Sequence, residues 1–333
     1  MNAFIFPGQG CQNARDMITL KNSLYKLPEI KQILYKCNSS LLKELYDNFP
    51  KAKEIFELAN DFLGRRITDV MFYGTEQQLM ETQNTQPAVF LYEVALALSQ
   101  DHISPDVVAG HSLGEFAALV VNGTISFEDG LNLVLHRALI AQKTCENTNT
   151  AMGAVIGLSD EYVARRIKEI WDETGEPVYF ANYNGPGQVV ISGSKKGIRQ
   201  ACKAFMKEGA KKAVPLMIGG SFHTPYMEEA RLELKKHIDE TIFNSPVIPV
   251  CQCVDGELNL DPEKIKNNLE HITHPVLWTH MVHNMVSSGV DKFYEVGPDD
   301  TLQKIVTRMY PEKKITTIWS IPIYKQYNPL NNI

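Results

Sequence analysis

The chain has 333 residues, of which 44% are hydrophobic, and a formal net charge of −6 at pH 7. This length can bury a large core and suggests two domains, or one domain with an inserted part. The acidic balance argues against nucleic acid as the main partner, since binding it requires basic side chains that neutralise phosphates. Residues 1–7 lack the basic and long apolar parts of a signal peptide, and no run approaches the length of a membrane span. We therefore expect a cytoplasmic protein without a membrane partner.

The first segment predicts a strand followed by a loop that approaches a ligand. Residues 2–6 form an apolar strand that ends in Pro7-Gly8-Gln9-Gly10. The glycines on both sides of Gln9 let the backbone come close to a bound group. A phosphate-binding loop is the rival interpretation, but no Gly-Lys-Ser/Thr follows. We expect Gln9 to offer a backbone N–H near an oxyanion.

Helices are predicted between this strand and the next. Residues 13–47 are rich in Lys and Leu and predict surface helices or a lid, and residues 52–63 predict an amphipathic helix. Thr85-Gln86-Pro87 predicts the start of another helix, because proline is tolerated in the first helical turn. Gln86 would then face either solvent or the site.

The motif Gly110-x-Ser112-x-Gly114 follows a short apolar run and precedes apolar residues at helical spacing. A strand, a turn and a helix are the context of a nucleophile elbow, in which a serine on a sharp turn needs neighbours without Cβ. The N–H of Leu113 would lie at a helix N-terminus, where it favours an oxyanion. An ordinary serine in a glycine-bounded turn gives the same short motif, and it is the context that favours a nucleophile.

A capped helix is predicted after the elbow helix. Ser126-x-x-Asp129 resembles a capping box, and apolar residues follow it at helical spacing. Arg137 falls within this helix. Taken by itself, a lone arginine on a helix is usually a solvated surface charge.

Residues 151–218 follow a different pattern: strand, helix, two strands joined by a turn-rich loop, helix and strand. This βαββαβ order predicts a small ferredoxin-like subdomain, which makes a cleft where it is inserted. Residues 1–150 and 219–333 would form the larger subdomain, an α/β-hydrolase-like core with a mostly parallel sheet. Residues 292–297 predict its last strand, before a closing helix.

The histidines and cysteines limit which catalytic base, metal site or disulfides the chain can have. His223 stands in a glycine-loosened segment before a helix and is the natural candidate for a base. Four later histidines could imitate a metal site, but no Glu or Cys accompanies them at ligand spacing, so we expect no metal. They are His271, His274, His280 and His283. The six cysteines, Cys251 and Cys253 among them, are scattered and predict mostly buried thiols.

Several ordered motifs together resemble the malonyl-CoA:acyl carrier protein transacylases, including the discrete acyltransferases that serve polyketide synthases in trans. The likeness runs nearly from end to end, although the Lys- and Leu-rich region before residue 45 is longer than in that family. The motifs are Phe6-Pro7-Gly8-Gln9-Gly10, Thr85-Gln86-Pro87-Ala88, Gly110-His111-Ser112-Leu113-Gly114-Glu115, Asn182-Tyr183-Asn184, Phe222-His223 and Glu295-Val296-Gly297-Pro298.

The resemblance implies a ping-pong transfer in polyketide or fatty acid biosynthesis. Ser112 would take a malonyl group from coenzyme A and yield it to the phosphopantetheine thiol of an acyl carrier protein, with no permanently bound cofactor. His223 would be the base, oriented by a backbone carbonyl that the resemblance assigns to Leu277. The N–H groups of Gln9 and Leu113 would form the oxyanion hole.

The resemblance also reverses the interpretation of Arg137, which falls where the family binds the malonyl carboxylate. Phe222 is similar to the malonyl-selective pattern, and Gln86 and Asn182 are expected to line the pocket.

The alternative function is a proofreading hydrolase that strips acyl groups from carrier proteins with the same Ser–His pair, and related enzymes of that kind lack the arginine. A third hypothesis is a docking subunit with an inactive site, and the presence of both Ser112 and His223 argues against it. We expect a monomer.

Overall fold

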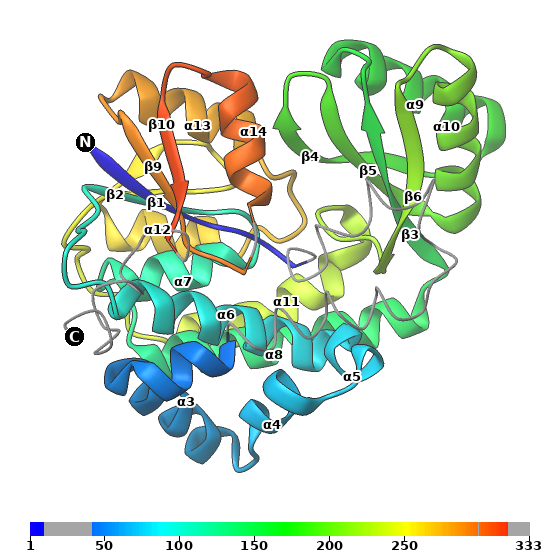
Figure 1. Ribbon diagram of the computed structural model, residues 1–333. Helices are drawn as coiled ribbons and strands as arrows, with labels where there is room; N and C mark the ends of the chain where they lie inside the picture. The colour runs from blue at the N-terminus through cyan, green and yellow to red at the C-terminus, as the bar shows by residue number, and fades with distance from the viewer. Residues whose placement is uncertain (10–41, 299, 319–333) are drawn as a thin grey trace, which may run out of the picture.

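The computed structural model describes residues 1–9, 42–298 and 300–318. The strands form two separate sheets, and helices lie between most of them along the chain (Figure 1). Most of the Lys- and Leu-rich region predicted at residues 13–47 lies outside the described residues, as do Cys11 and Cys37. None of the helices in the described ranges is long and apolar enough to cross a membrane.

The larger sheet has six strands in the order β10-β9-β1-β2-β7-β8. Their bounds are β1 (Asn2–Phe6), β2 (Val107–Gly110), β7 (Val250–Cys251), β8 (Leu258–Asn259), β9 (Lys292–Glu295) and β10 (Lys314–Thr317). Pairing is parallel from β10 through to β7, and β8 pairs antiparallel with β7. The predicted mostly parallel sheet is therefore present. The prediction that residues 292–297 form the last strand is wrong, because β10 follows the closing helix α14 (Thr301–Met309) and pairs with β9.

Both faces of the central strands are buried, because their side chains alternate between two cores. Phe4, Phe6 and Val108 belong to a core shared with the helices on one face. Ala3 and Ile5 belong to a second core on the other face. The helices of the first core are α3 (Pro50–Leu63), α4 (Ile67–Tyr73), α6 (Thr82–Leu98), α7 (Gly114–Val121), α8 (Phe127–Asn147), α11 (Glu228–Glu240) and α12 (Pro262–Leu269), and those of the second are α13 (Trp278–Ser287) and α14.

Helix α6 begins earlier than the sequence predicted. The proline was expected in the first turn, but α6 follows α5 (Glu76–Met80) directly and begins at Thr82, so Pro87 lies inside it. The Glu81 carbonyl accepts hydrogen bonds from the N–H groups of Asn84 and Thr85, at 2.8 Å each, and so closes the first turn ahead of the proline. As a result Gln86 lies within the helix and is fully buried.

The smaller sheet has four antiparallel strands in the order β4-β5-β3-β6. Its elements follow the βαββαβ order predicted for this part of the chain. They are β3 (Thr150–Ile156), α9 (Asp160–Thr174), β4 (Val178–Gly185), β5 (Gln188–Ser194), α10 (Lys195–Lys207) and β6 (Lys212–Gly219). The apolar sides of α9 and α10 pack on this sheet and form a core of their own.

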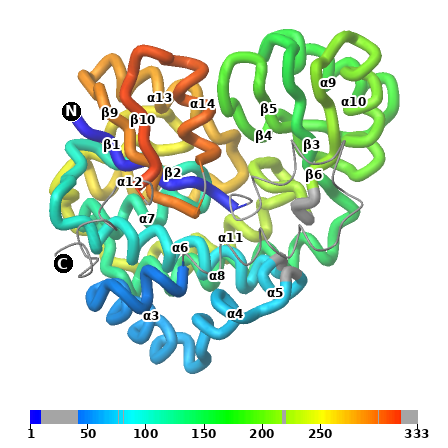
Figure 2. The backbone as a smooth tube through the Cα atoms, in the orientation of Figure 1, coloured from blue at the N-terminus to red at the C-terminus, as the bar shows by residue number. Residues whose placement is uncertain are grey.

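The smaller sheet is anchored to the larger body through β4. The N–H of Tyr183 donates to the Val276 carbonyl, and the N–H of Val276 donates to the Ala181 carbonyl, both at 2.9 Å. Figure 2 follows the chain from the end of α8 into the small lobe and back through β6 to α11.

Candidate active site

Ser112 lies on a sharp turn between β2 and α7, as the motif predicted. Its φ angle is 56°, a left-handed conformation that is strained for a residue with a side chain. A Cβ on Gly110 would lie 2.0 Å from the Glu115 nitrogen, and one on Gly114 would lie 2.2 Å from the Phe6 carbonyl oxygen. Both contacts are with backbone, so only glycine fits on either side of the serine. The turn holds the hydroxyl clear of the chain on both sides.

His223 meets this serine from a distant part of the chain. It lies between β6 and the short helix η2 (Pro225–Met227), is 7% exposed, and also has a left-handed φ of 60°. Its Nε2 atom is 2.8 Å from the Ser112 Oγ. The structure therefore brings together the two residues that were predicted as nucleophile and base.

The carbonyl that orients His223 belongs to His274, and the assignment of this role to Leu277 is wrong. The His223 Nδ1 atom lies 3.0 Å from the His274 carbonyl oxygen. The Leu277 carbonyl instead accepts the N–H of Met281 at 3.0 Å, because Leu277 caps α13 and its carbonyl makes the first helical bond. A carbonyl accepts only, so Nδ1 carries the proton and Nε2 is free to take the serine proton.

His223 is held in its neutral form. Burial, with the positive charge of Arg137 and the nearby His111, lowers the pKa of His223 to about 3. A neutral imidazole is the form that can accept a proton from serine. His223 could therefore act as a base at neutral pH, and its ring nitrogens contact the Ser112 hydroxyl and the His274 carbonyl.

Arg137 is a buried residue of the site, and the interpretation of it as a surface charge is wrong. It is 5% exposed, on the side of α8 that faces the elbow. Its Nη2 donates to the Ser112 Oγ at 3.0 Å, and its Nη1 donates to the Gln86 Oε1 at 2.6 Å. Gln86 in turn donates to the side-chain oxygen of Gln9 at 3.0 Å. One chain of hydrogen bonds thus joins Gln9, Gln86, Arg137 and Ser112.

The Arg137 guanidinium is buried without a counter-charge in contact. Within the described ranges no carboxylate forms an ion pair with it, and its Nε has no hydrogen-bond partner. Burial lowers the pKa of Arg137 to about 10, so the group is still charged at neutral pH. Because buried charges are normally paired, this one is available to an anion that enters the site.

Two backbone donors are free near the serine. In the part of the chain that the structure describes, the N–H groups of Gln9 and Leu113 have no hydrogen-bond acceptor. Leu113 directly precedes α7, so its N–H points along the positive end of a helix dipole. A developing oxyanion is the kind of group that such donors stabilise.

A narrow pocket opens beside the Ser–His pair, with a cavity volume of about 30 Å³. Ser112, Glu115, Phe116, Arg137, His223, Cys253, Val254, Asn268, Leu269, His271, Ile272, His274 and Pro275 line it. Phe222 packs in a small apolar cluster beside His223. Asn182 is buried in β4, where it bridges to Val276. Of the two residues expected to line the pocket, Gln86 reaches it only through Arg137 and Asn182 is not part of the described lining, and Phe222, predicted from the malonyl-selective pattern, is not part of it either.

The four later histidines do not gather around a common point. The rings of His271 and His274 touch edge to face, with centroids 4.7 Å apart, whereas the His283 Nδ1 is 2.7 Å from the Tyr310 hydroxyl. Across the described ranges, no three His, Cys, Asp or Glu side chains are arranged to hold a metal ion.

Sequence reasoning missed Cys253 and Glu115 as parts of the site. Both line the pocket, and the Cys253 thiol accepts the N–H of Ser112 at 3.2 Å. The only sequence signal was the glutamate that ends the Gly110 to Glu115 motif. Nothing in the spacing indicated that residue 253 returns to the elbow.

The site thus combines a strained serine, a neutral imidazole held by a carbonyl, two backbone donors and a buried cation, on an α/β fold. These are the groups that acyl transfer through a Ser–His pair would need. A model of the acyl transferase domain family matches residues 3–331.

Named relatives agree with this class. The malonyl CoA-acyl carrier protein transacylase of Bacillus subtilis is 31% identical over 319 residues, which cover 95% of this chain and 92% of the relative. The protein of that name from Escherichia coli K12 is 33% identical over 311 residues, 92% of each chain.

Solved structures agree as well. The acyl carrier protein S-malonyltransferase of Vibrio cholerae superposes with a TM-score of 0.84 at 32% identity, covering 98% of this chain and 99% of that one. A malonyl-transacylase solved in complex with a type II polyketide synthase acyl carrier protein gives a TM-score of 0.81 at 31% identity, covering 95% and 94%. This chain therefore belongs to the malonyl CoA-acyl carrier protein transacylase family, and the resemblance predicted from its motifs is confirmed.

Proposed function

We propose that the protein transfers a malonyl group from coenzyme A to the phosphopantetheine thiol of an acyl carrier protein, through an ester on Ser112. The observation that supports this most is the buried Arg137 guanidinium, 3.0 Å from the Ser112 Oγ and without a carboxylate partner in the described ranges. A free carboxylate on the acyl group would complete a bidentate pair there. A neutral acetyl group would leave the cation buried and unpaired.

The position of Arg137 also sets the length of the acyl group. Its Nη2 lies within hydrogen-bond distance of the same oxygen that attacks the thioester. The carboxylate must therefore lie within one or two carbons of the reacting carbonyl. Malonyl satisfies this condition, whereas a longer dicarboxylic chain would have to fold back on itself in a narrow pocket.

Loading of the enzyme follows from the hydrogen-bond pattern. Ser112 gives its proton to the His223 Nε2 while its Oγ bonds to the thioester carbon. The carbonyl oxygen becomes an oxyanion, which the N–H groups of Gln9 and Leu113 would receive. When the intermediate collapses, the carbon–sulfur bond breaks and the proton on His223 passes to the departing coenzyme A sulfur.

Unloading is the reverse sequence with a second thiol. The phosphopantetheine thiol gives its proton to His223 and its sulfur attacks the Ser112 ester. The carbon–oxygen bond then breaks and Ser112 recovers the proton. No cofactor is required at either stage, because both half-reactions exchange one acyl bond for another.

The domain boundaries belong to the same proposal. We assign residues 1–150 and 219–333 to an α/β-hydrolase-like large subdomain and residues 151–218 to a ferredoxin-like small subdomain, working as a cytoplasmic monomer. The antiparallel order β4-β5-β3-β6 with two helices on one face supports the second assignment. The mostly parallel sheet with the elbow after β2 supports the first.

Intact-mass measurement after incubation with malonyl-CoA tests the loading step. We expect one malonyl adduct on the wild-type chain and none on Ser112→Ala. Failure of the wild-type chain to accept an acyl group from any dicarboxylic coenzyme A donor would refute the proposal. A proofreading hydrolase is the second candidate, and the buried cation beside Ser112 argues against it because stalled acyl chains have no terminal carboxylate to pair with it.

A further inference from the structure

We propose that Cys253 is a positioning residue: its thiol, held in place by Glu115, clamps the strained backbone of Ser112 in the reactive geometry. The inference rests on Ser112 being the nucleophile of the proposed function. It adds a residue to the catalytic arrangement that makes no contact with His223 or Arg137 in the hydrogen bonds of the described chain.

The thiol bridges the two sides of the elbow. The N–H of Ser112 donates to the Cys253 Sγ at 3.2 Å, and the Sγ donates to the Gly110 carbonyl at 3.0 Å. The two backbone groups come from the end of β2 and from the serine itself, with one residue between them. A single sulfur atom therefore fixes the direction of the peptide groups that enter the turn.

Glu115 fixes the position of the thiol. Its Oε2 accepts the N–H of Cys253 and its Oε1 accepts the side-chain amide of Gln252, both at 3.0 Å. Glu115 stands in the first turn of α7, and its own N–H donates to the Ser112 carbonyl at 3.2 Å. The carboxylate thus ties the start of the elbow helix to the segment that supplies the sulfur.

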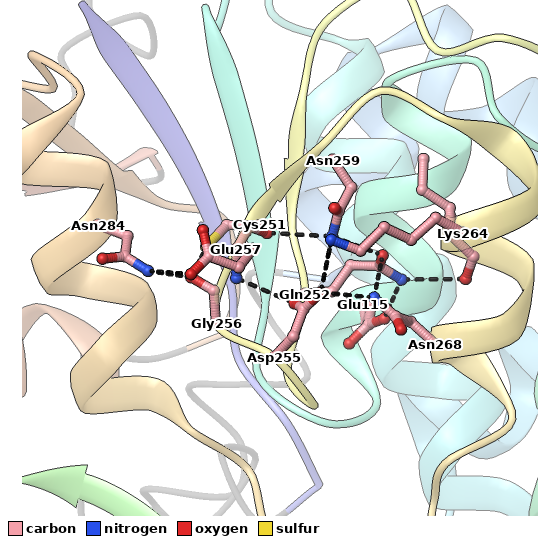
Figure 3. A network of polar contacts seen from close by, with 11 residues as sticks. Glu115, Cys251, Gln252, Asp255, Gly256, Glu257, Asn259, Lys264, Asn268 and Asn284 are labelled. Atoms are coloured by element: carbon pink, nitrogen blue, oxygen red, sulfur yellow. Dashed lines mark hydrogen bonds and ion pairs between the residues drawn. The ribbon is translucent and has the colours of Figure 1, made fainter.

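Gln252 anchors this segment in turn. It is fully buried, and its Oε1 accepts hydrogen bonds from the side-chain amides of Asn259 and Asn268, both at 3.0 Å. Figure 3 shows this network, in which Gln252 lies between Glu115, Asn259 and Asn268. Because each polar atom of the Gln252 and Glu115 side chains has a partner, the network has one favoured arrangement.

The clamp acts where strain would otherwise be released. Ser112 has a φ of 56°, and the N–H that the thiol accepts is on the same residue. Without that bond the peptide can rotate towards an unstrained conformation, which moves the Oγ away from the His223 Nε2. Burial raises the pKa of the Cys253 thiol well above its ordinary value, so the sulfur keeps the proton that it donates to the Gly110 carbonyl.

The test compares Cys253→Ala and Cys253→Ser with Cys251→Ala as the matched control. Cys251 is a fully buried thiol two residues away, and its Sγ donates to the Gly256 carbonyl at 3.2 Å, not to the elbow. Quenched-flow intact-mass measurement gives the limiting rate of malonyl loading and the apparent KM for malonyl-CoA, and a thermal melt gives the Tm.

We expect Cys253→Ala to lower the limiting loading rate by about tenfold or more, since an error of about 1 Å in the nucleophile costs about 100-fold. The apparent KM should stay within about twofold, because Arg137 and the other residues that line the pocket beside Cys253 are unchanged. Cys253→Ser, whose hydroxyl also accepts and donates, should recover most of the rate. Cys251→Ala should load at the wild-type rate, even if its Tm falls as far as that of Cys253→Ala.

The inference would be overturned if Cys253→Ala loaded at the wild-type rate. It would also be overturned if Cys253→Ala and Cys253→Ser lost the same fraction of the loading rate. A fluorophosphonate that phosphonylates reactive serines provides a readout that does not depend on the acyl donor. If the wild-type chain reacts with this probe but not with malonyl-CoA, the proposed function fails and the clamp is still tested by the phosphonylation rates of the same variants.

Discussion

Replacing Arg137 by alanine should lower the loading of malonyl groups and raise the relative loading of acetyl groups. The wild-type guanidinium is 5% exposed and is held by Gln86 at 2.6 Å and by Ser112 at 3.0 Å. Its Nη2 atom faces the reacting oxygen of Ser112, near which the carboxylate of a bound malonyl group must also lie. Arg137→Ala removes the partner of that carboxylate and leaves the charge of the substrate buried and unpaired.

The magnitude follows from the burial of the pair. Removing one partner of a buried ion pair costs about 3–5 kcal/mol, and each 1.4 kcal/mol is a factor of ten. The kcat/KM for malonyl loading should therefore fall by about 100-fold or more. Acetyl loading loses no such pair, and it gains from the removal of an unpaired buried charge. The Tm should not fall sharply, because in the described part of the ligand-free chain the lost cation forms no ion pair with a carboxylate.

The assay is quenched-flow loading of Ser112 from malonyl-CoA and from acetyl-CoA, read by intact mass. Arg165→Ala is the control, because Arg165 is an exposed arginine of α9 whose Nε lies 3.7 Å from Glu169. Arg137→Lys should fall between the two, since it keeps the charge but loses the bidentate fork. An unchanged ratio of malonyl to acetyl loading in Arg137→Ala would refute the assignment of the carboxylate site.

Two further predictions concern the elbow and the base. Gly114→Ala would place a Cβ 2.2 Å from the Phe6 carbonyl oxygen, so it should cost about 1–3 kcal/mol of stability and most of the loading activity. Gly123→Ala should also lose stability, because the φ angle of Gly123 is 78°, but its Cβ meets its nearest atom at 3.6 Å and lies beyond the far end of α7, so it should keep the loading activity. Equal loading rates for the two variants would contradict this. Because the pKa of His223 is lowered to about 3, the kcat/KM for loading should stay level between pH 7 and pH 5, and a fall with a midpoint near 6.5 would show an ordinary histidine. The unfolded chain takes up this proton first as the pH falls below 6.5, so the contribution of His223 to folding stability should decrease by about 1.4 kcal/mol per pH unit from there towards pH 3.

Local spacing was enough to predict the elements that present the nucleophile. The turn at Ser112 requires a glycine on each side, because backbone atoms lie where the Cβ of any other residue would be. The cap at Ser126 is likewise local, because its side chain accepts the N–H of Asp129 three residues on. The order of strands and helices along residues 151–218 could be predicted as well, because each of these elements has its own local pattern of apolar residues.

Contacts between segments far apart in the sequence could not be predicted from local spacing. Arg137 looked like a surface charge because the helical period does not say which face of α8 meets the elbow, and only the resemblance corrected it. The carbonyl that orients His223 was assigned three residues too late, since the start of α13 decides which carbonyls are already used. Cys253 could not be found at all, because its role depends on the loop that brings it back to Ser112.

The central claim is that the acyl group on Ser112 passes to a thiol and not to water. Its most direct test isolates the malonyl-Ser112 enzyme and mixes it either with a holo acyl carrier protein or with buffer, following both proteins by intact mass. The account predicts that the malonyl group leaves Ser112 and appears on the carrier many times faster than it is lost in buffer. Release at the same rate in both mixtures, with no malonyl on the carrier, would contradict it and identify a hydrolase.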